Sequence, residues 1–320
     1  MEQQKIVSRD EWLSARKALL AEEKTLTRER DRVAALRRDL PWVNVEKDYV
    51  FETPTGKRHL IDLFGPRSQL IIQHFMLTPG SDHICPGCAL GADHVDAARQ
   101  HFEQADLSYV AISRATLPEI EAVKKRMGWR FDWVSSHGTS FNYDFGVSFT
   151  PEQVASGNAG YNYGTSPYAL EDLHGMSVFA RNEAGDVFHT YSTYARGSET
   201  IVGAFNYLDM VPKGRNESGT MSWVKLHDEY ENTGNAGYNY GTSPFALEDL
   251  HGMSVFARND AGDVFHTYST YARGSETIVG AFNYLDMVPK GRNESGTMSW
   301  VKLHDEYENA SSSGACCAAE

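Results

Sequence analysis

A strand, a cysteine pair and a hairpin predict an α/β fold with helices on both faces of a sheet. The apolar run over 69–77 is typical of a buried strand, and a loop, Cys85-Pro86-Gly87-Cys88 and a helical pattern follow it. A second buried strand is predicted over 107–113, and a hairpin and a helix come later. The order βαβ, then ββα, with C-x-x-C at a helix start, predicts a thioredoxin-like three-layer sandwich.

The first forty residues predict a long helix. Ser8-Arg9-Asp10-Glu11 forms a capping box, and Pro41 ends the pattern. The second apolar seam that a coiled coil needs is poor, so we expect the helix to pack on its own domain, with a coiled-coil dimer as the alternative. We therefore predict an N-terminal helix over 1–40 and a thioredoxin-like domain over 41–232. The heptad positions are Trp12, Leu19, Leu26, Val33 and Leu40.

The remaining elements follow from turn residues and periodicity. Short strands are predicted over 43–63, because Pro54-Thr55-Gly56 is a turn. Asn182-Glu183-Ala184-Gly185 joins the two strands of the hairpin. The other predicted elements are a helix over 117–127 that ends at Gly128, a strand over 129–135, hairpin strands over 176–180 and 187–192, and a helix over 198–208 capped by Ser198.

Composition and charge exclude several classes of protein. The chain has 320 residues, a net charge of −13 and a pI near 5.4, which argues against a nucleic-acid partner. No apolar stretch approaches the ~20 residues of a membrane span, and the N-terminus lacks a secretory pattern. Only four cysteines occur, which fits a cytoplasmic protein with a catalytic pair. We expect no cofactor and no bound metal.

A tandem repeat occupies the second half of the chain. Asn158–Asn232 and Asn235–Asn309 match over 75 positions, with an offset of 77 residues. Two positions differ, Tyr168 against Phe245 and Glu183 against Asp260. Identity this high is unlike a solenoid, whose repeats are shorter and diverged. We therefore treat 235–309 as a second copy of one hairpin-helix unit, followed by a flexible tail over 310–320 that carries Cys316 and Cys317.

A single sheet has one position for this unit, and side-chain packing cannot choose between the copies. Loop closure favours the first copy by roughly 2 kcal/mol, because its connection to the preceding strands is much shorter. The second copy is then left with an uncovered apolar face. We expect it to promote a domain-swapped homodimer, or to form a small appended lobe without a function of its own.

The position of the two cysteines predicts redox chemistry. The unpaired N–H groups and the positive dipole at a helix start favour a thiolate at Cys85, and Pro86 suits the first helical turn. Two intervening residues allow Cys88 to close a small disulfide ring. We therefore predict that Cys85 is the nucleophile and Cys88 the resolving thiol of a thiol–disulfide oxidoreductase. Its partners would be a thiol or disulfide substrate, protein or small molecule, and a reductant that the sequence does not identify.

The chain resembles the bacterial family called domain of unknown function 899. The resemblance implies a thioredoxin-like fold and a dithiol–disulfide oxidoreductase activity, and it extends from Trp12 to Glu231. The motifs that carry it are Leu40-Pro41-Trp42-Val43, His74-Phe75-Met76, Cys85-Pro86-Gly87-Cys88, Lys125-Arg126-Met127-Gly128-Trp129, Phe141-Asn142-Tyr143-Asp144-Phe145, the run from Phe188 to Gly197, and Met221-Ser222-Trp223-Val224.

One departure from thioredoxins concerns the substrate surface. Thioredoxins place a proline before the hairpin, opposite the cysteines, whereas this chain has Leu173-His174-Gly175-Met176 there. Substrate docking must therefore differ. We expect His83, Pro86, His174 and Gly175 to contact the substrate, and the two histidines to tune the Cys85 pKa.

Two other chemistries remain open at this point. A thiol peroxidase is the nearer one, because the stretches 113–119 and 131–136 resemble peroxiredoxins and Arg114 could steady a thiolate. Asp82, however, stands where that pattern has Thr or Ser three residues before the cysteine. A non-enzymatic metal-binding or interaction protein is the other alternative, because His83, Cys85, Cys88 and His94 are all possible zinc ligands.

Overall fold

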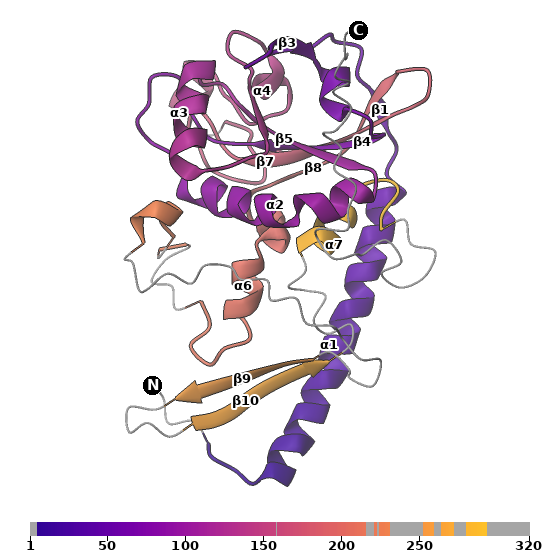
Figure 1. Cartoon of the computed structure of the whole chain (residues 1–320), viewed down its shortest axis with the longest axis vertical. Coiled ribbons are helices and arrows are strands. Elements are labelled where there is room, and N and C mark those ends of the chain that lie inside the picture. Colours follow the sequence, from indigo (N-terminus) through magenta and orange to yellow (C-terminus); the bar gives the residue numbers. More distant parts are fainter. Residues whose placement is uncertain are drawn as a thin grey trace, which may run out of the picture.

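An eight-stranded mixed sheet forms the centre of the structure (Figure 1). The computed structural model describes residues 5–157, 159–215, 221–222, 224–230, 252–258, 264–271 and 280–292. In the sheet the strand order is β1-β8-β7-β4-β5-β6-β2-β3. The strands are β1 (Val43–Asn44), β2 (Val50–Thr53), β3 (Gly56–His59), β4 (Gln69–His74), β5 (Leu107–Ser113), β6 (Asp132–Ser135), β7 (Gly175–Arg181) and β8 (Val187–Tyr194).

The four central strands have thioredoxin-like topology. Strands β4 and β5 are parallel and are connected by helix α2 (Pro86–Gln104), which forms the predicted βαβ unit. Strand β7 pairs antiparallel with β4, with Ile71 opposite Val178, and β8 pairs antiparallel with β7. Helix α3 (Leu117–Met127) leads to β6, which lies parallel to β5. The predicted thioredoxin-like fold class is confirmed by this arrangement.

Helical segments cover both faces of the sheet, so the domain has three layers. Strand β4 is buried on both faces, and successive residues face opposite layers: Ile71 belongs to the core under α2, and Ile72 to the core on the other side. Helices α2 and α3 pack on the first face. The second face is covered by η1 (Leu60–Phe64) and α4 (Phe141–Asp144).

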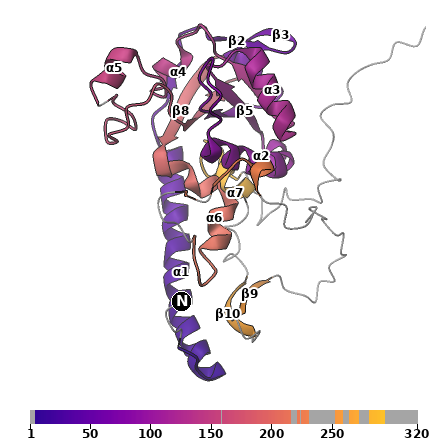
Figure 2. The same cartoon turned by 90° about the vertical axis from the view of Figure 1, so that its left-hand side faces the viewer.

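The N-terminal helix α1 (Arg9–Arg38) has the predicted capping box between Ser8 and Glu11. The expectation that it packs on its own domain is wrong for most of its length, because Ala34 is its only buried residue. Figure 2 shows the helix extending well beyond the sheet. The leucines on its surface are Leu13, Leu19, Leu20, Leu26 and Leu36.

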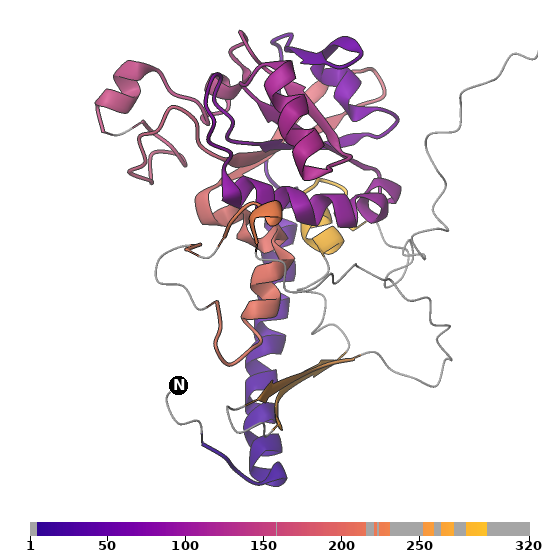
Figure 3. The same cartoon turned by 60° about the vertical axis from the view of Figure 1, so that its left-hand side comes forward.

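The hairpin of the second copy lies beside α1 instead of joining the main sheet (Figure 3). Its strands β9 (Gly252–Arg258) and β10 (Val264–Tyr271) pair with each other. The Trp12 indole donates to the Thr267 carbonyl at 3.4 Å, and the Arg16 guanidinium to the Ser269 carbonyl at 3.0 Å. The first copy supplies β7 and β8 of the main sheet.

The helices of the two copies both reach the core beneath α2, through Phe205 and Tyr284, but their matching tyrosines differ in burial. Helix α7 (Gly280–Leu285) of the second copy packs against α2, and its Tyr284 is 0% exposed. Helix α6 (Gly203–Leu208) has the same sequence, but its Tyr207 is 49% exposed. The single helix predicted over 198–208 is wrong: a 3₁₀ segment η2 (Ala195–Ile201) precedes α6, and Val202 between them is extended.

Two further short segments complete the described chain. Helix α5 (Pro151–Ala155) lies apart from the sheet (Figure 2), and η3 (His227–Glu229) contacts the end of α3, where Asp228 pairs with Arg126 at 2.7 Å. None of the helices in the described ranges is long and apolar enough to cross a bilayer. The predicted tail over 310–320 lies outside the described residues.

A chain of polar side chains is buried in the face opposite α2. His74 Nε2 lies 2.8 Å from the Ser177 hydroxyl, which lies 2.8 Å from the Ser192 hydroxyl, and His189 Nε2 lies 2.7 Å from Ser192. The Nδ1 atom of His74 is buried, and no described residue forms a hydrogen bond with it. Burial is the main cause that lowers the pKa of His74 to about 3, and the nearby His189 lowers it further.

This buried histidine predicts acid sensitivity of the fold. The folded-state pKa of His74 lies below its unfolded value near 6.5, so the stabilising contribution is complete above that pH and is lost as pH falls toward about 3. We expect the slope to reach at most about 1.4 kcal/mol per pH unit. Urea unfolding between pH 7 and pH 4 should show a shallower loss in His74→Phe than in the natural chain. Parallel curves for the two proteins would contradict the assignment to His74.

Candidate functional site

Cys85 is the N-cap residue of α2. Its backbone is extended, with φ −63° and ψ 112°, and its sulfur accepts a hydrogen bond from the Cys88 backbone N–H at 3.3 Å. Pro86 is the first residue of the helix, where its missing N–H leaves no gap in the hydrogen bonding. Because Cys85 is the N-cap residue, its sulfur lies at the positive end of the helix dipole. The residue is partly exposed, so a reactant can reach the sulfur.

The two thiols have opposite pKa shifts. Hydrogen bonding from the Cys88 thiol is the largest cause that lowers the pKa of Cys85, and the backbone N–H groups of Cys88 and Gly87 act in the same direction against burial. Burial raises the pKa of Cys88 well above its ordinary value, and the neighbouring Cys85 raises it further. The Cys88 sulfur accepts a hydrogen bond from the Met76 N–H at 3.5 Å. Cys85 therefore ionises first, and Cys88 stays a thiol.

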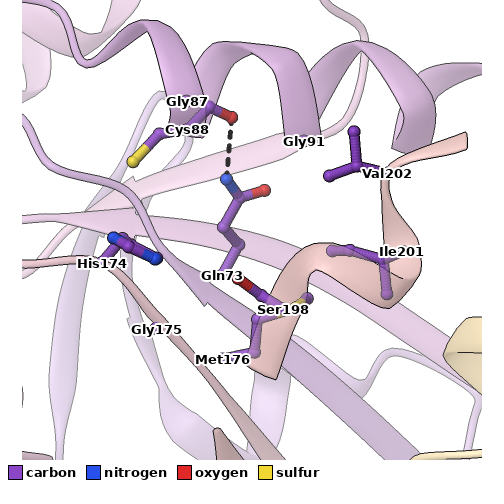
Figure 4. Close-up of a pocket in the computed structure, with 10 residues that line it drawn as sticks. All are labelled: Gln73, Gly87, Cys88, Gly91, His174, Gly175, Met176, Ser198, Ile201 and Val202. Carbon is purple, nitrogen blue, oxygen red and sulfur yellow. Dashed lines mark hydrogen bonds between the residues drawn. The ribbon is translucent and has the colours of Figure 1, made fainter. Parts of the chain in front are cut away.

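A small cavity lies beside Cys88, between the first turns of α2 and the start of β7 (Figure 4). Its volume is ≈ 40 Å³, enough for one or two water molecules. We call it the Cys88 cavity. Its lining residues are Gln73, Gly87, Cys88, Gly91, His174, Gly175, Met176, Ser198, Ile201 and Val202.

The structure brings some of the sequence-predicted site residues together and leaves one apart. His174 and Gly175, which are distant from the cysteines in the sequence, share the cavity with Cys88. Pro86 lies between the cysteines at the helix start. His83 is exposed in the preceding loop and is not among the lining residues of the Cys88 cavity.

Gly175 is required by close packing. A Cβ atom at this position would lie 2.6 Å from Cδ1 of the Tyr194 ring, closer than real contacts allow, and 3.2 Å from Val147. The Tyr161 hydroxyl fixes the same region, because it donates to the His174 carbonyl at 2.6 Å and accepts from the Ala195 N–H at 2.8 Å. The backbone around His174 is therefore held from two sides.

Gln73 and Met221 belong to the site, but the sequence analysis does not identify them. The Gln73 side chain donates to the Cys88 carbonyl at 2.9 Å and accepts from the Tyr109 hydroxyl. A glutamine inside an apolar strand is a sequence signal for a buried polar contact, because such side chains are seldom buried without a partner. Met221 lies over Gly87, where an added Cβ would be 2.9 Å from the methionine methyl group. No local sequence pattern indicates that contact.

Arg114, suggested above to steady a thiolate, pairs with a carboxylate cluster in the structure. Its guanidinium pairs with Asp172 at 2.7 Å and with Glu171 at 2.6 Å. Asp172 is buried and also accepts from the hydroxyls of Thr78 and Ser148, at 2.6 Å and 2.5 Å. These contacts fasten the segment before His174 to the central strands.

His94 is also engaged elsewhere. Its Nδ1 lies 2.7 Å from the Leu90 carbonyl, and its Nε2 accepts from the Ala204 N–H at 3.0 Å. Nδ1 is thus bonded within α2 and Nε2 holds α2 against α6, which removes His94 from the predicted four-ligand zinc site. Among the described residues, no group of three potential metal ligands is found.

These features define a thioredoxin-like α/β domain with a cysteine pair at the start of the first crossover helix. The chain belongs to the family described as "Bacterial protein of unknown function (DUF899)", whose model matches residues 1–230 and again residues 232–307. The second match falls on the second copy of the repeat, with the preceding two-residue link. No curated protein matches the chain.

Two solved structures can be compared with this chain. Peroxidoxin BcpB from Mycobacterium tuberculosis gives a TM-score of 0.36 at 15% identity, over 49% of this chain and 86% of that protein. The mitochondrial 2-Cys peroxiredoxin from Plasmodium falciparum gives a TM-score of 0.30 at 14% identity, over 48% of this chain and 79% of that protein. The fold class rests on the strand order and helix placement described above.

Proposed function

We propose that the protein is a thiol–disulfide oxidoreductase. The observation that carries the proposal is the place of Cys85 as the N-cap residue of α2, where its sulfur accepts a hydrogen bond from the Cys88 N–H at 3.3 Å. The opposite directions of the Cys85 and Cys88 pKa shifts agree with it. The Cys85 thiolate attacks a substrate disulfide and releases one thiol, which leaves a mixed disulfide. Cys88 then attacks Cys85, releases the second thiol and closes the Cys85–Cys88 disulfide. An external dithiol must reduce this disulfide before the next cycle.

The surroundings of Cys85 support a substrate with an apolar surface next to its disulfide. Ile84 and Met221 are partly buried apolar side chains that pack with Cys85 against the core. Such side chains can bind a disulfide-bearing protein or a small apolar disulfide without a charged partner. Arg114, the residue that the peroxidase alternative needs, is paired with Asp172 at 2.7 Å.

The proposal is tested by a redox titration in glutathione buffers with mass-tagging of free thiols. The protein should carry Cys316→Ser and Cys317→Ser, so that only Cys85 and Cys88 report. We expect one reversible two-electron couple and a Cys85 pKa well below ~8.5. Thiols that stay unreactive, or that react only after a metal is chelated, would refute the proposal. Peroxide consumption at the expense of a dithiol, faster than disulfide reduction, would favour the peroxidase instead.

A further inference from the structure

The resolving step needs a base. Cys88 must lose its proton before its sulfur can attack Cys85, yet burial raises the pKa of Cys88 well above the ordinary value of a thiol. Bulk hydroxide would serve slowly near neutral pH, because little thiolate is present there. A proton acceptor close to Cys88 would remove this limit.

His174 is the one Brønsted base among the lining residues of the Cys88 cavity. Figure 4 shows the Cys88 sulfur and the His174 ring on the same side of the Gln73 side chain. Gln73 offers only an amide, which does not accept a proton near neutral pH. The nearby Tyr161 hydroxyl is occupied by the His174 carbonyl and the Ala195 N–H.

The hydrogen bonding of His174 fixes its proton on the other ring nitrogen. Nε2 lies 3.1 Å from the Ala195 carbonyl oxygen, which can only accept, so Nε2 carries the hydrogen. Nδ1 then has a free lone pair, and it has no hydrogen-bond partner among the described residues. Burial lowers the pKa of His174, so the ring is neutral near pH 7 and ready to accept a proton.

Resting on the function proposed above, we propose that His174 is the general base of the resolving step. The Cys88 thiol transfers its proton to Nδ1, directly or through one water in the cavity, and the thiolate attacks Cys85 of the mixed disulfide. The bond between Cys85 and the substrate sulfur breaks as the Cys85–Cys88 bond forms. The leaving thiolate takes the proton from Nδ1, so the ring is neutral again and no additional oxidant or reductant is consumed.

Stopped-flow mixing of the reduced protein with dithiobis(nitrobenzoate) separates the two steps. Attack by Cys85 releases one coloured thiolate, and attack by Cys88 releases the second. In the Cys316→Ser, Cys317→Ser background, we expect His174→Gln to leave the first release within about threefold and to slow the second by about a hundredfold near pH 7. Glutamine can still donate to the Ala195 carbonyl, so the local structure has a replacement hydrogen bond.

The pH profile of the unmodified site is the second readout, and it does not depend on the variant folding. With His174 as base, the second release is level above the His174 pKa and falls below it. The titratable groups near the ring are Cys88, which lines the same cavity, and Tyr161, whose ring centroid lies 6.3 Å from that of His174. A rate that instead rises tenfold per pH unit from pH 6 to pH 9 would assign deprotonation to bulk hydroxide and overturn the proposal.

The repeat supplies a matched control. His251 stands in the second copy where His174 stands in the first, within the same local sequence. His251→Gln should leave both releases unchanged, because the hairpin after it pairs only with itself. The assignment to His174 would be overturned if His251→Gln, and not His174→Gln, slowed the second release. It would also be overturned if the second release were equally fast in His174→Gln and the parent protein. If the parent protein gave no first release, the proposed oxidoreductase function would be refuted. This outcome differs from a failure of the His174 assignment, in which the first release is still seen.

Discussion

Replacing Cys88 with serine should convert the protein into a trap for its substrates. Cys85 keeps the helix N-terminus and the backbone N–H groups that favour its thiolate, so it still attacks a disulfide. The mixed disulfide then has no neighbouring thiol to resolve it. We expect turnover to fall by at least about a thousandfold, while a covalent adduct accumulates that non-reducing gel electrophoresis and intact-mass spectrometry detect.

Cys85→Ser is the paired variant, and with both variants made in the Cys316→Ser, Cys317→Ser background it should form no adduct at all. The buried Cys88 has a raised pKa and little thiolate, so it does not replace Cys85 as the nucleophile. Substrates captured from cell extract by Cys88→Ser should be released by a dithiol. Equal adduct yields from Cys85→Ser and Cys88→Ser would contradict the division of roles between the two cysteines.

The second large effect is expected at Tyr284, where two copies of one sequence have different environments. The Tyr284 ring packs 5.0 Å from Phe102 and 6.3 Å from Tyr109, measured between centroids, and it is fully buried. Tyr284→Ala should lower the free energy of unfolding by about 3–5 kcal/mol through the cavity it leaves. Tyr207→Ala changes the same residue in the first copy, which is 49% exposed, and should cost less than about 1 kcal/mol.

Urea unfolding followed by circular dichroism measures both costs. A third variant sharpens the comparison, because the buried Tyr284 hydroxyl has no hydrogen-bond partner among the residues that the structure describes. Tyr284→Phe removes that hydroxyl and should be neutral or stabilising by about 1 kcal/mol. Equal losses in the Tyr207→Ala and Tyr284→Ala variants would show that α6 and α7 exchange places against α2.

The sequence predicts the frame of the domain well, because each central element has a strong local signal. The apolar strand before the cysteines, the strand over 107–113 and the helix over 117–127 appear within a few residues of their predicted bounds. The hairpin is found where Asn182 and Gly185 indicate its turn. Cys85 at the start of α2 follows from the motif and its spacing.

What the sequence does not predict depends on contacts between distant segments. Nothing local shows that Asp172 pairs with the guanidinium of Arg114, or that Met221 covers Gly87. The placement of α7 is the clearest case. Its sequence is identical to that of α6, so any method that uses local sequence alone must assign both helices the same burial.

The split placement of the two copies has a consequence for how this gene will diverge. Packing constrains the hairpin of the first copy, through β7 and β8, and the helix of the second copy, through α7. Strands β9 and β10 pair with each other and lie beside α1, so packing in the main sheet does not constrain them. The same hairpin sequence is therefore expected to tolerate different substitutions in its two copies.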